Sequence, residues 1–495
     1  MARRPYRNVL ILMSDEHSNK VLGCHGHSYV RTPNLDRLAA GGARFANAYT
    51  NCPICIPARA SFATGRYAFE TGCWDNALAY TGVPPSWGHA LRARGVPSYS
   101  IGKLHYRNET DDAGFTEQIL PMHVVDGIGD LLGAVRDPLP VRYKSTALAT
   151  EIGPGETPYT EYDRKITDAA CNWLAQRAGQ GPWTTFVSWV APHFPLVAPR
   201  EFYDLYSALE LPLPKASAPQ DWPAHPWLDA FRQCFITDQA FTDETRRVAI
   251  ASYYGLVSFL DSNIGRVLAA LEASGALADT LVIYTSDHGD NLGTRGLWGK
   301  STMYEESAAI PMMLSGTGIA GGAVVETPVS LVDVHATLLD VFECEDAARG
   351  RGESLLELVH RKHESERVVF SEYHAAGAKT GVFMLRQGAY KYVHYVGMPP
   401  QLFDLEADPE ELQDLAAHPA QAARLRAFER ELRKICDPDE VDRRAKADQA
   451  ALVERHGGRD KVVGKGGFGA TPAPGHRPAY AAAAQVEAER GGTPV

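Results

Sequence analysis

The stretch Asn51–Arg66, NCPICIPARASFATGR, places two cysteines three residues apart and follows them with a proline and an arginine. The spacing of Cys52 and Cys55 is that of a thioredoxin-like redox pair. A zinc site made of cysteines would need a second closely spaced pair, which the sequence lacks. A tyrosine-phosphatase loop would need an arginine six positions after its cysteine, where this chain has Ala58 and Ser61. The spacing therefore excludes these two sites and leaves the redox pair open.

A second interpretation makes Cys55 the start of a helix. Pro57 has the fixed φ that suits the first turn of a helix, and Gly65 stands where the helix would end. The free N–H groups and the dipole at the helix start would lower the pKa of the Cys55 thiol or stabilise a developing oxyanion. Arg59, one turn on, can neutralise a neighbouring negative group. The alternative is an ordinary helix start with a buried cysteine.

Polar side chains also follow four short apolar runs of the kind that form buried parallel strands. In open α/β sheets, ligands bind beyond the carboxyl ends of such strands. A single aspartate there is usually a cap or turn residue, but capping does not require acids, imidazoles and a lysine at one edge. We therefore expect a site at this edge of the sheet. The runs and their polar endings are NVLILMSDEH with Asp15, Glu16 and His17, VPSYSIGKLHY with Lys103 and His105, TTFVSWVAPHFP with His193, and TLVIYTSDHGD with Asp287, His288 and Asp290.

The elements around these runs predict an α/β chain of 495 residues with one large and one small domain. We assign residues 1–365 to a catalytic domain. Residues 366–440 contain strands, among them a hairpin across Gln387-Gly388, and a helix, which predicts a small α+β domain. Residues 441–495 turn polar and then rich in Gly, Pro and Ala, so we expect an extended tail there.

Charge and composition argue against several classes of protein. The net charge of -11 argues against non-specific nucleic-acid binding. The apolar run Val9–Met13 is too short for a signal peptide or a membrane span, and we expect a cytoplasmic protein without membrane contact. The eight cysteines do not have the dense spacing of a disulfide framework, which fits a reducing compartment. Phe468 and Tyr480 in the expected tail predict contact with another subunit of a homo-oligomer.

The stretch CIPARASFATGR resembles the C-x-P-x-R…T-G-R signature of the sulfatase family, within the alkaline phosphatase superfamily. The resemblance covers roughly residues 8–415 and continues in order through NVLILMSDE, TPNLDRLA, GKLH, APHFP, SDHGD, GLWGK and LFDLEADPEE. WDNA and SDHGDNLG look most like choline-sulfatase-type and phosphonate-monoester-hydrolase-type members. The resemblance implies an alkaline-phosphatase-like α/β/α sandwich with a mostly parallel central sheet. It also implies that a formylglycine-generating maturation enzyme oxidises Cys55 to formylglycine, although Ala58 departs from the serine of many members.

The resemblance further implies which residues form the site. The metal ligands it implies are Asp15, Glu16, Cys55 as formylglycine, Asp287 and His288. The catalytic residues it implies are Cys55, Arg59, Lys103, His105, His193 and Lys300, with Asn76, Lys103, His193 and Lys300 binding the substrate. Converging carboxylates repel one another unless a cation bridges them, which supports one divalent metal ion. The His288 imidazole is a softer ligand than the oxygen atoms that make up the rest of the site, so the site suits Mn²⁺ as well as Ca²⁺. We expect four further polar residues to be structural: His25, His27, Asp290 and Asp333.

Together these features predict a metal-dependent sulfatase that hydrolyses sulfate monoesters of a small molecule. A phosphonate monoester or phosphodiester hydrolase is the alternative with the same site, and a redox or non-catalytic binding protein of the same fold is a distant one. Lys103 favours sulfate, because its charge can stabilise the departing oxygen where the resembling phosphonate hydrolases tend to carry a tyrosine. Residues 108–160 and 211–242 are expected to supply loops of the pocket for the organic group.

Overall fold

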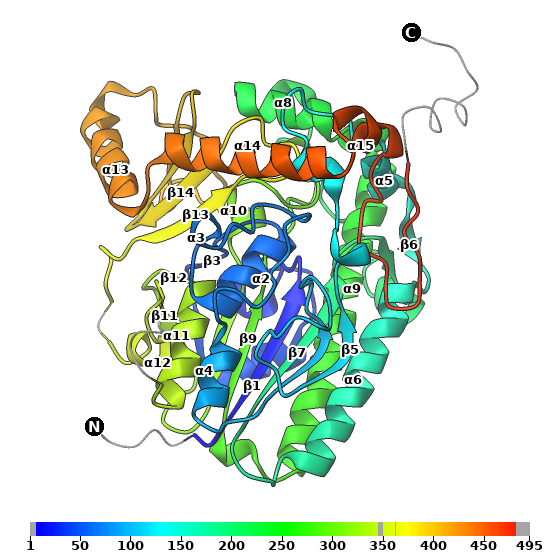
Figure 1. Ribbon diagram of the computed structural model, residues 1–495, viewed down its shortest axis with the longest axis vertical. Coiled ribbons are helices and arrows are strands. Elements are labelled where there is room, and N and C mark those ends of the chain that lie inside the picture. Colours follow the sequence, from blue (N-terminus) through cyan, green and yellow to red (C-terminus); the bar gives the residue numbers. More distant parts are fainter. Residues whose placement is uncertain (1–5, 345–349, 362, 482–495) are drawn as a thin grey trace.

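The computed structural model describes residues 6–344, 350–361 and 363–481. Its central sheet consists of β1 (Asn8–Asp15), β2 (Ala43–Phe45), β4 (Ser98–Lys103), β5 (Glu117–Met122), β7 (Trp183–Pro192), β9 (Thr280–Ser286), β10 (Met312–Ser315) and β11 (Ala323–Val325). Their order is β11-β2-β10-β9-β1-β7-β4-β5 (Figure 1). The strands β9, β1, β7 and β4 are adjacent and parallel. The four apolar runs of the sequence are thus four neighbouring strands whose carboxyl ends meet at one edge.

Helices cover both faces of this sheet, because its strands are apolar on both sides. Along β1, Val9 and Ile11 pack into one apolar cluster and Leu10 and Leu12 into the other. The first face is covered by α2 (Cys55–Thr64), α4 (Trp87–Ala93) and α11 (Leu331–Val341). The second is covered by α1 (Pro33–Ala40), α6 (Pro158–Arg177) and α9 (Asp243–Ala273). The expected α/β/α sandwich with a mostly parallel sheet is confirmed (Figure 1).

Short elements complete the large domain. Two small parallel pairs are β3 (Ala48–Tyr49) with β12 (Val329–Ser330) and β6 (Ile152–Pro154) with β8 (Leu196–Ala198). The short helices are α3 (Ala68–Thr71), α5 (Ala147–Thr150), α7 (Arg200–Tyr203), α8 (Pro226–Cys234), α10 (Glu305–Ala308) and α12 (Leu355–Leu358). Among the described residues, no helix is long and apolar enough to cross a membrane.

A second, antiparallel sheet follows in the chain. Its strands, in the order β13-β14-β15-β16, are β13 (Val369–Tyr373), β14 (Val382–Gln387), β15 (Tyr390–Tyr395) and β16 (Gln401–Asp404). The predicted hairpin is confirmed, since β14 and β15 pair across a turn in which Gly388 has a φ of 57°. The helix predicted over residues 410–436 is confirmed for its second part as α13 (Ala422–Ile435), and residues 410–418 are not helical. Phe428 and Leu432 of α13 pack into the apolar cluster of this sheet.

The extended tail expected from residue 441 is wrong for its first part. The structure has α14 (Pro438–Arg455) and α15 (Arg459–Lys465) there, and α14 lies across the second sheet in Figure 1. The Asp437 side chain caps α14 by accepting from the Asp439 N–H. Val441, Ala445 and Leu452 form a narrow buried stripe, which the polar composition of the segment conceals.

The aromatic residues of the tail pack on their own chain. Phe468 is buried, and its ring lies edge-on to that of Tyr480 with 5.5 Å between centroids. We expected these rings to contact another subunit because they would otherwise be solvated. Their packing within the chain removes that reason. The homo-oligomer itself stays a prediction.

Candidate active site

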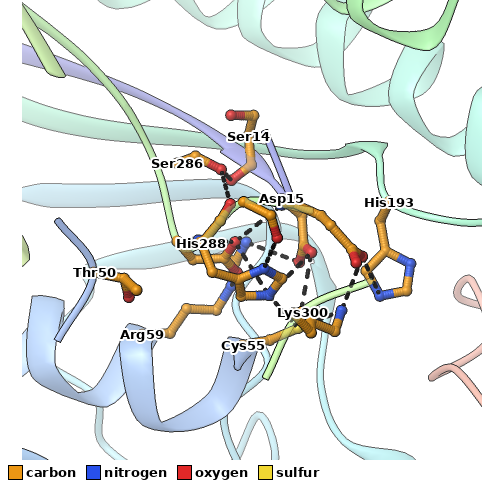
Figure 2. A network of polar contacts seen from close by, with 12 residues as sticks. Ser14, Asp15, Thr50, Cys55, Arg59, His193, Ser286, His288 and Lys300 are labelled. Carbon is orange, nitrogen blue, oxygen red and sulfur yellow. Dashed lines mark hydrogen bonds and ion pairs between the residues drawn. The ribbon is translucent and has the colours of Figure 1, made fainter. Parts of the chain in front are cut away.

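Four strand ends bring the predicted polar residues together at one edge of the central sheet. Asp15 ends β1, and Glu16 follows it with a φ of 70°. Asp287 and His288 follow β9, and His193 follows β7. The remaining two belong to β4: Lys103 is its last residue and His105 lies two positions on. All seven are buried, and Figure 2 shows Asp15, His288 and His193 from three different strands around one centre.

Cys55 is the first residue of α2 and points into this group. Gly65 closes the helix with a φ of 66°, so the predicted start and end of α2 are confirmed. The Cys55 Sγ lies 3.2 Å from His288 Nε2, 3.4 Å from Lys300 Nζ and 3.8 Å from Asp15 Oδ1 (Figure 2). Cys52 instead belongs to the apolar cluster around α8, and both cysteines are free thiols. This arrangement does not support a Cys52–Cys55 redox pair.

Burial has a larger effect on the pKa of the Cys55 thiol than its position at the start of a helix. It raises the pKa of the Cys55 thiol to about 12, with Asp15 raising it further and Lys300 opposing the shift. The net shift of this pKa is therefore upward, opposite to the lowering expected from the helix N-terminus. A thiol that stays protonated is a weak nucleophile.

Arg59 bridges the two aspartates of the site. Its Nε lies 2.8 Å from Asp287 Oδ2, and its Nη2 lies 3.3 Å from Asp15 Oδ2. Its Nη1 donates to the Lys103 carbonyl and to Ser188 Oγ, both at 2.9 Å. The side chain is 1% exposed, so the guanidinium neutralises two buried carboxylates in a fixed orientation.

The acids and His288 form a group that fits a divalent cation. One ligand atom from each of Asp15, Cys55, Asp287 and His288 lies within 4.8 Å of the others, and all four residues are buried. Burial alone would raise the pKa of Asp15, but Lys103 and the other cations around it hold that pKa well below its usual value. Two carboxylates and one imidazole are a donor set that Ca²⁺ or Mn²⁺ accepts.

Glu16 lies in a second group, on the side of Lys300. Its Oε2 is 3.0 Å from Lys300 Nζ and 3.4 Å from His193 Nε2, whereas its buried Oε1 has no hydrogen-bond partner among the described residues. Burial raises the pKa of Glu16 to about 8, and Lys300 opposes the shift. The Glu16 carboxylate thus contacts two groups that were predicted to bind substrate. It also lies within 4.8 Å of a ligand atom of Asp15, in a second group that could hold a metal ion, so its role as a ligand stays a prediction.

The remaining predicted residues each have a defined partner. Lys103 Nζ forms an ion pair with Asp15. The Asn76 side-chain oxygen accepts from the Ile56 N–H at 3.1 Å, which places Asn76 beside the start of α2. His105 Nε2 lies 2.8 Å from Thr471 Oγ1, a contact that the sequence did not suggest. Asp290, expected to be structural, accepts from the N–H groups of Leu292 and Gly299.

A pocket with a mainly apolar wall opens beside Lys300, Glu16 and Asn76, and Asp130, Arg142 and Lys144 also line it. Its apolar lining consists of Ile54, Leu132, Leu148, Phe194, Phe231, Phe235 and Trp298. The two segments expected to supply loops contribute to it, since Leu132 and Leu148 come from residues 108–160 and Phe231 and Phe235 from residues 211–242. Sequence reasoning did not identify these side chains, because their apolar character resembles that of any core residue.

Models of known families match most of the chain. The Sulfatase model matches residues 7–344, and the model described as N-sulphoglucosamine sulphohydrolase, C-terminal, matches residues 293–437. The chain is 35% identical over 426 residues to a choline-sulfatase of Rhizobium meliloti, covering 83% of both chains. It is 29% identical over 435 residues to arylsulfatase K of Danio rerio, covering 83% of this chain and 80% of the relative.

Solved structures agree with this match. A phosphonate monoester hydrolase from Silicibacter pomeroyi superposes with a TM-score of 0.70 and 26% identity, covering 86% of this chain and 94% of the other. The phosphonate monoester hydrolase of Agrobacterium radiobacter gives a TM-score of 0.72 and 23% identity, covering 86% and 95%. At that identity the second similarity concerns the fold alone.

Proposed function

The chain belongs to the sulfatase family, and we propose that it hydrolyses sulfate monoesters through a formylglycine made from Cys55, beside one divalent metal ion. The family and its named relatives make it a sulfuric ester hydrolase. One observation supports the proposal that a formylglycine and a metal ion take part in the reaction. The Cys55 Sγ lies 3.2 Å from His288 Nε2 and 3.4 Å from Lys300 Nζ, between the candidate ligands and a cation of the pocket.

Conversion of Cys55 to an aldehyde explains how sulfate could leave again. A cysteine that had accepted a sulfuryl group would have no internal route to release it. In a hydrated aldehyde, one hydroxyl attacks sulfur while the ester oxygen leaves with a proton, and deprotonation of the other then re-forms the aldehyde and expels sulfate. Addition of water regenerates the starting group. The buried position of Cys55 keeps this centre away from bulk solvent.

Asp15, Asp287, His288 and the modified Cys55 would hold the metal ion. When bound, the ion neutralises the carboxylates and polarises the nucleophile and a sulfate oxygen. Arg59 contacts both aspartates and so orients them as ligands.

Cations on the pocket side would stabilise the substrate. Lys300 Nζ lies within 3.4 Å of Cys55 Sγ and 3.0 Å of Glu16 Oε2, and His193 Nε2 lies 3.4 Å from the same Glu16 oxygen. A sulfuryl transition state carries negative charge on its equatorial oxygens and on the departing oxygen, which ammonium groups and N–H donors stabilise. Lys103, next to Asp15, can serve the departing oxygen in the same way.

The apolar pocket favours an aryl group as the organic half of the ester. Phe231 and Phe235 stack with 4.7 Å between their centroids, and Phe194 stacks on His193 at 4.4 Å. Aromatic walls of this kind bind a flat apolar ring through burial and ring contacts.

A phosphonate monoester or phosphodiester hydrolase is the second candidate. The imidazole of His288 and the position of Asn76 suit that activity as well, and the structural similarity to a phosphonate monoester hydrolase covers 86% of the chain. Lys103 is the residue that favours sulfate over phosphorus esters.

The test is a comparison of kcat/KM for an aryl sulfate, the matched phenylphosphonate monoester and the matched phosphodiester. It uses protein that carries formylglycine in full, with Ca²⁺ and Mn²⁺ tested separately and Cys55→Ala as the background control. We expect the sulfate to be preferred. A preference of more than about tenfold for either phosphorus ester, about 1.4 kcal/mol of transition-state free energy, would replace the sulfatase by the second candidate.

A further inference from the structure

The segment after α15 returns to the active site of its own chain. We call residues 466–481 the C-terminal strap; Figure 1 shows it in red. The Ala481 N–H donates to the Gly467 carbonyl at 2.9 Å, which closes the strap into a loop. Ala473 is buried in the apolar cluster on the α6 side of the sheet, and Phe468 packs against Tyr480. The strap is therefore attached to the catalytic domain at several points.

Two contacts fix Thr471 beside the catalytic residues. Its Oγ1 lies 2.8 Å from His105 Nε2, although 366 positions separate the two residues. Its carbonyl accepts from the Tyr159 hydroxyl, and the Tyr159 ring lies edge-on to His193 with 6.0 Å between centroids. Thr471 is thus held between the ends of β4 and β7.

The strap also forms part of the pocket wall. Gly467 and Gly469 line the same pocket as Glu16 and Lys300. Gly469 has a φ of 77°, and a Cβ added there would come within 2.9 Å of Lys144 Cγ. Glycine allows the strap to pass this close to the opposite wall.

We propose that Thr471 is a positioning residue that orients the His105 imidazole for hydrolysis, so that the C-terminal strap is part of the active site of its own chain. The inference rests on the proposed sulfatase function and on the catalytic role that the resemblance implies for His105. The Thr471 hydroxyl occupies Nε2, which leaves Nδ1 as the ring nitrogen that can exchange a proton within the site. Nδ1 is buried and has no hydrogen-bond partner among the described residues.

The backbone of His105 gives a second reason why its ring needs a partner. His105 has a φ of 61°, a conformation that non-glycine residues seldom adopt. The backbone fixes where the side chain of His105 begins, but the orientation of the ring also depends on its rotamer. Among the described residues, the Thr471 hydroxyl is the hydrogen-bond partner of the ring.

The first test is a double-mutant cycle in the full-length, formylglycine-bearing protein. Thr471→Val keeps the shape of the side chain and removes the hydroxyl, and Thr471→Ser is the matched control that keeps it. We expect Thr471→Val to lower kcat/KM for an aryl sulfate by about 10- to 100-fold, as loss of an outer partner of an active-site group typically does. Thr471→Ser should stay within about threefold of the wild type. In a His105→Ala background, Thr471→Val should change kcat/KM by less than about twofold.

The cycle would give a different result if the strap only stabilised the fold and did not orient His105. An equal loss from Thr471→Val in both backgrounds would overturn the proposal, as would a Thr471→Val enzyme within about twofold of the wild type. If the wild type prefers a phosphorus ester, the same cycle is run with that ester. Failure of the sulfatase assignment and failure of the role of Thr471 are then separate outcomes.

A second test does not depend on turnover. Diethyl pyrocarbonate modifies accessible imidazoles, and mass spectrometry of the peptide that contains His105 measures the rate. We expect Thr471→Val to raise the rate at His105 at least about threefold over the wild type and over Thr471→Ser, because one ring nitrogen loses its partner. Equal rates in all three proteins would count against the proposal.

Discussion

His288 Nε2 lies 3.2 Å from Cys55 Sγ, although the two residues are 233 positions apart in the chain. The imidazole follows β9, and the thiol stands at the start of α2 on one face of the same sheet. Asp15, from the neighbouring strand β1, completes the contact with its Oδ1 at 3.8 Å from the sulfur. The Cys55 side chain, whose Cβ would become the aldehyde carbon with loss of the sulfur, is therefore also in the position of a metal ligand.

Cys55, and not Cys52, is predicted to be the modified residue. Cys55→Ala should abolish turnover, whereas Cys52→Ala should retain it, because Cys52 lies in an apolar cluster away from the acids. Peptide mass spectrometry of protein made with a maturation system should show an aldehyde-sized mass deficit at Cys55. An active enzyme with an entirely unmodified Cys55 thiol would contradict this prediction.

One divalent metal ion per chain is predicted to be required. Asp287→Asn and His288→Ala should each abolish turnover and lose the bound metal, because each removes a donor of the buried group around Cys55. Elemental analysis measures the metal content, and thermal unfolding checks the fold. Asp168→Asn, at an exposed ion pair with Arg266, is the control that should change neither. Full activity after exhaustive chelation, verified by elemental analysis, would refute the requirement.

Glu16 is predicted to position Lys300 and His193. Glu16→Gln keeps the shape of the side chain but replaces the carboxyl group that lies 3.0 Å from Lys300 Nζ by an amide. We expect metal content to stay within about twofold of the wild type, while kcat/KM falls about 10- to 100-fold. Asp287→Asn, measured in parallel, is the reference for loss of a ligand. If Glu16→Gln loses metal to the same extent, Glu16 is itself a ligand, as the resemblance implies.

Phe235 is predicted to bind the aryl group of the substrate. Its ring stacks on Phe231 and lines the pocket that opens beside Lys300. Phe235→Ala should raise KM for an aryl sulfate about 5- to 30-fold, equivalent to about 1–2 kcal/mol of lost burial and ring contact. KM for a short alkyl sulfate should change by less than about twofold, and Phe235→Leu should give an intermediate value. Equal effects on both substrates would show that Phe235 supports the fold and not the ligand.

Local patterns in the sequence were sufficient to predict the catalytic edge of the sheet. Each of the four strands is a buried segment that lacks charged residues before its end, and acidic, basic or imidazole side chains stand at or directly after that end, as at Asp15 and Asp287. Pro57 and Gly65 marked the helix that begins at Cys55 for the same reason, since their backbone preferences act over one or two residues. The sequence failed at α14, where the apolar stripe of Val441, Ala445 and Leu452 is narrow and the composition is polar.

The sequence by itself determined which residue types stand at the ends of strands and helices, because apolar runs, glycines and prolines act locally. Only the tertiary structure decided which of these side chains face one another. It placed the Glu16 carboxylate 3.0 Å from Lys300 Nζ, and it brought Thr471 to His105. It also assembled the aromatic pocket from two distant loops. Such contacts depend on the path of loops hundreds of residues apart, and that path is set by the packing of the whole chain, which has no local period in the sequence.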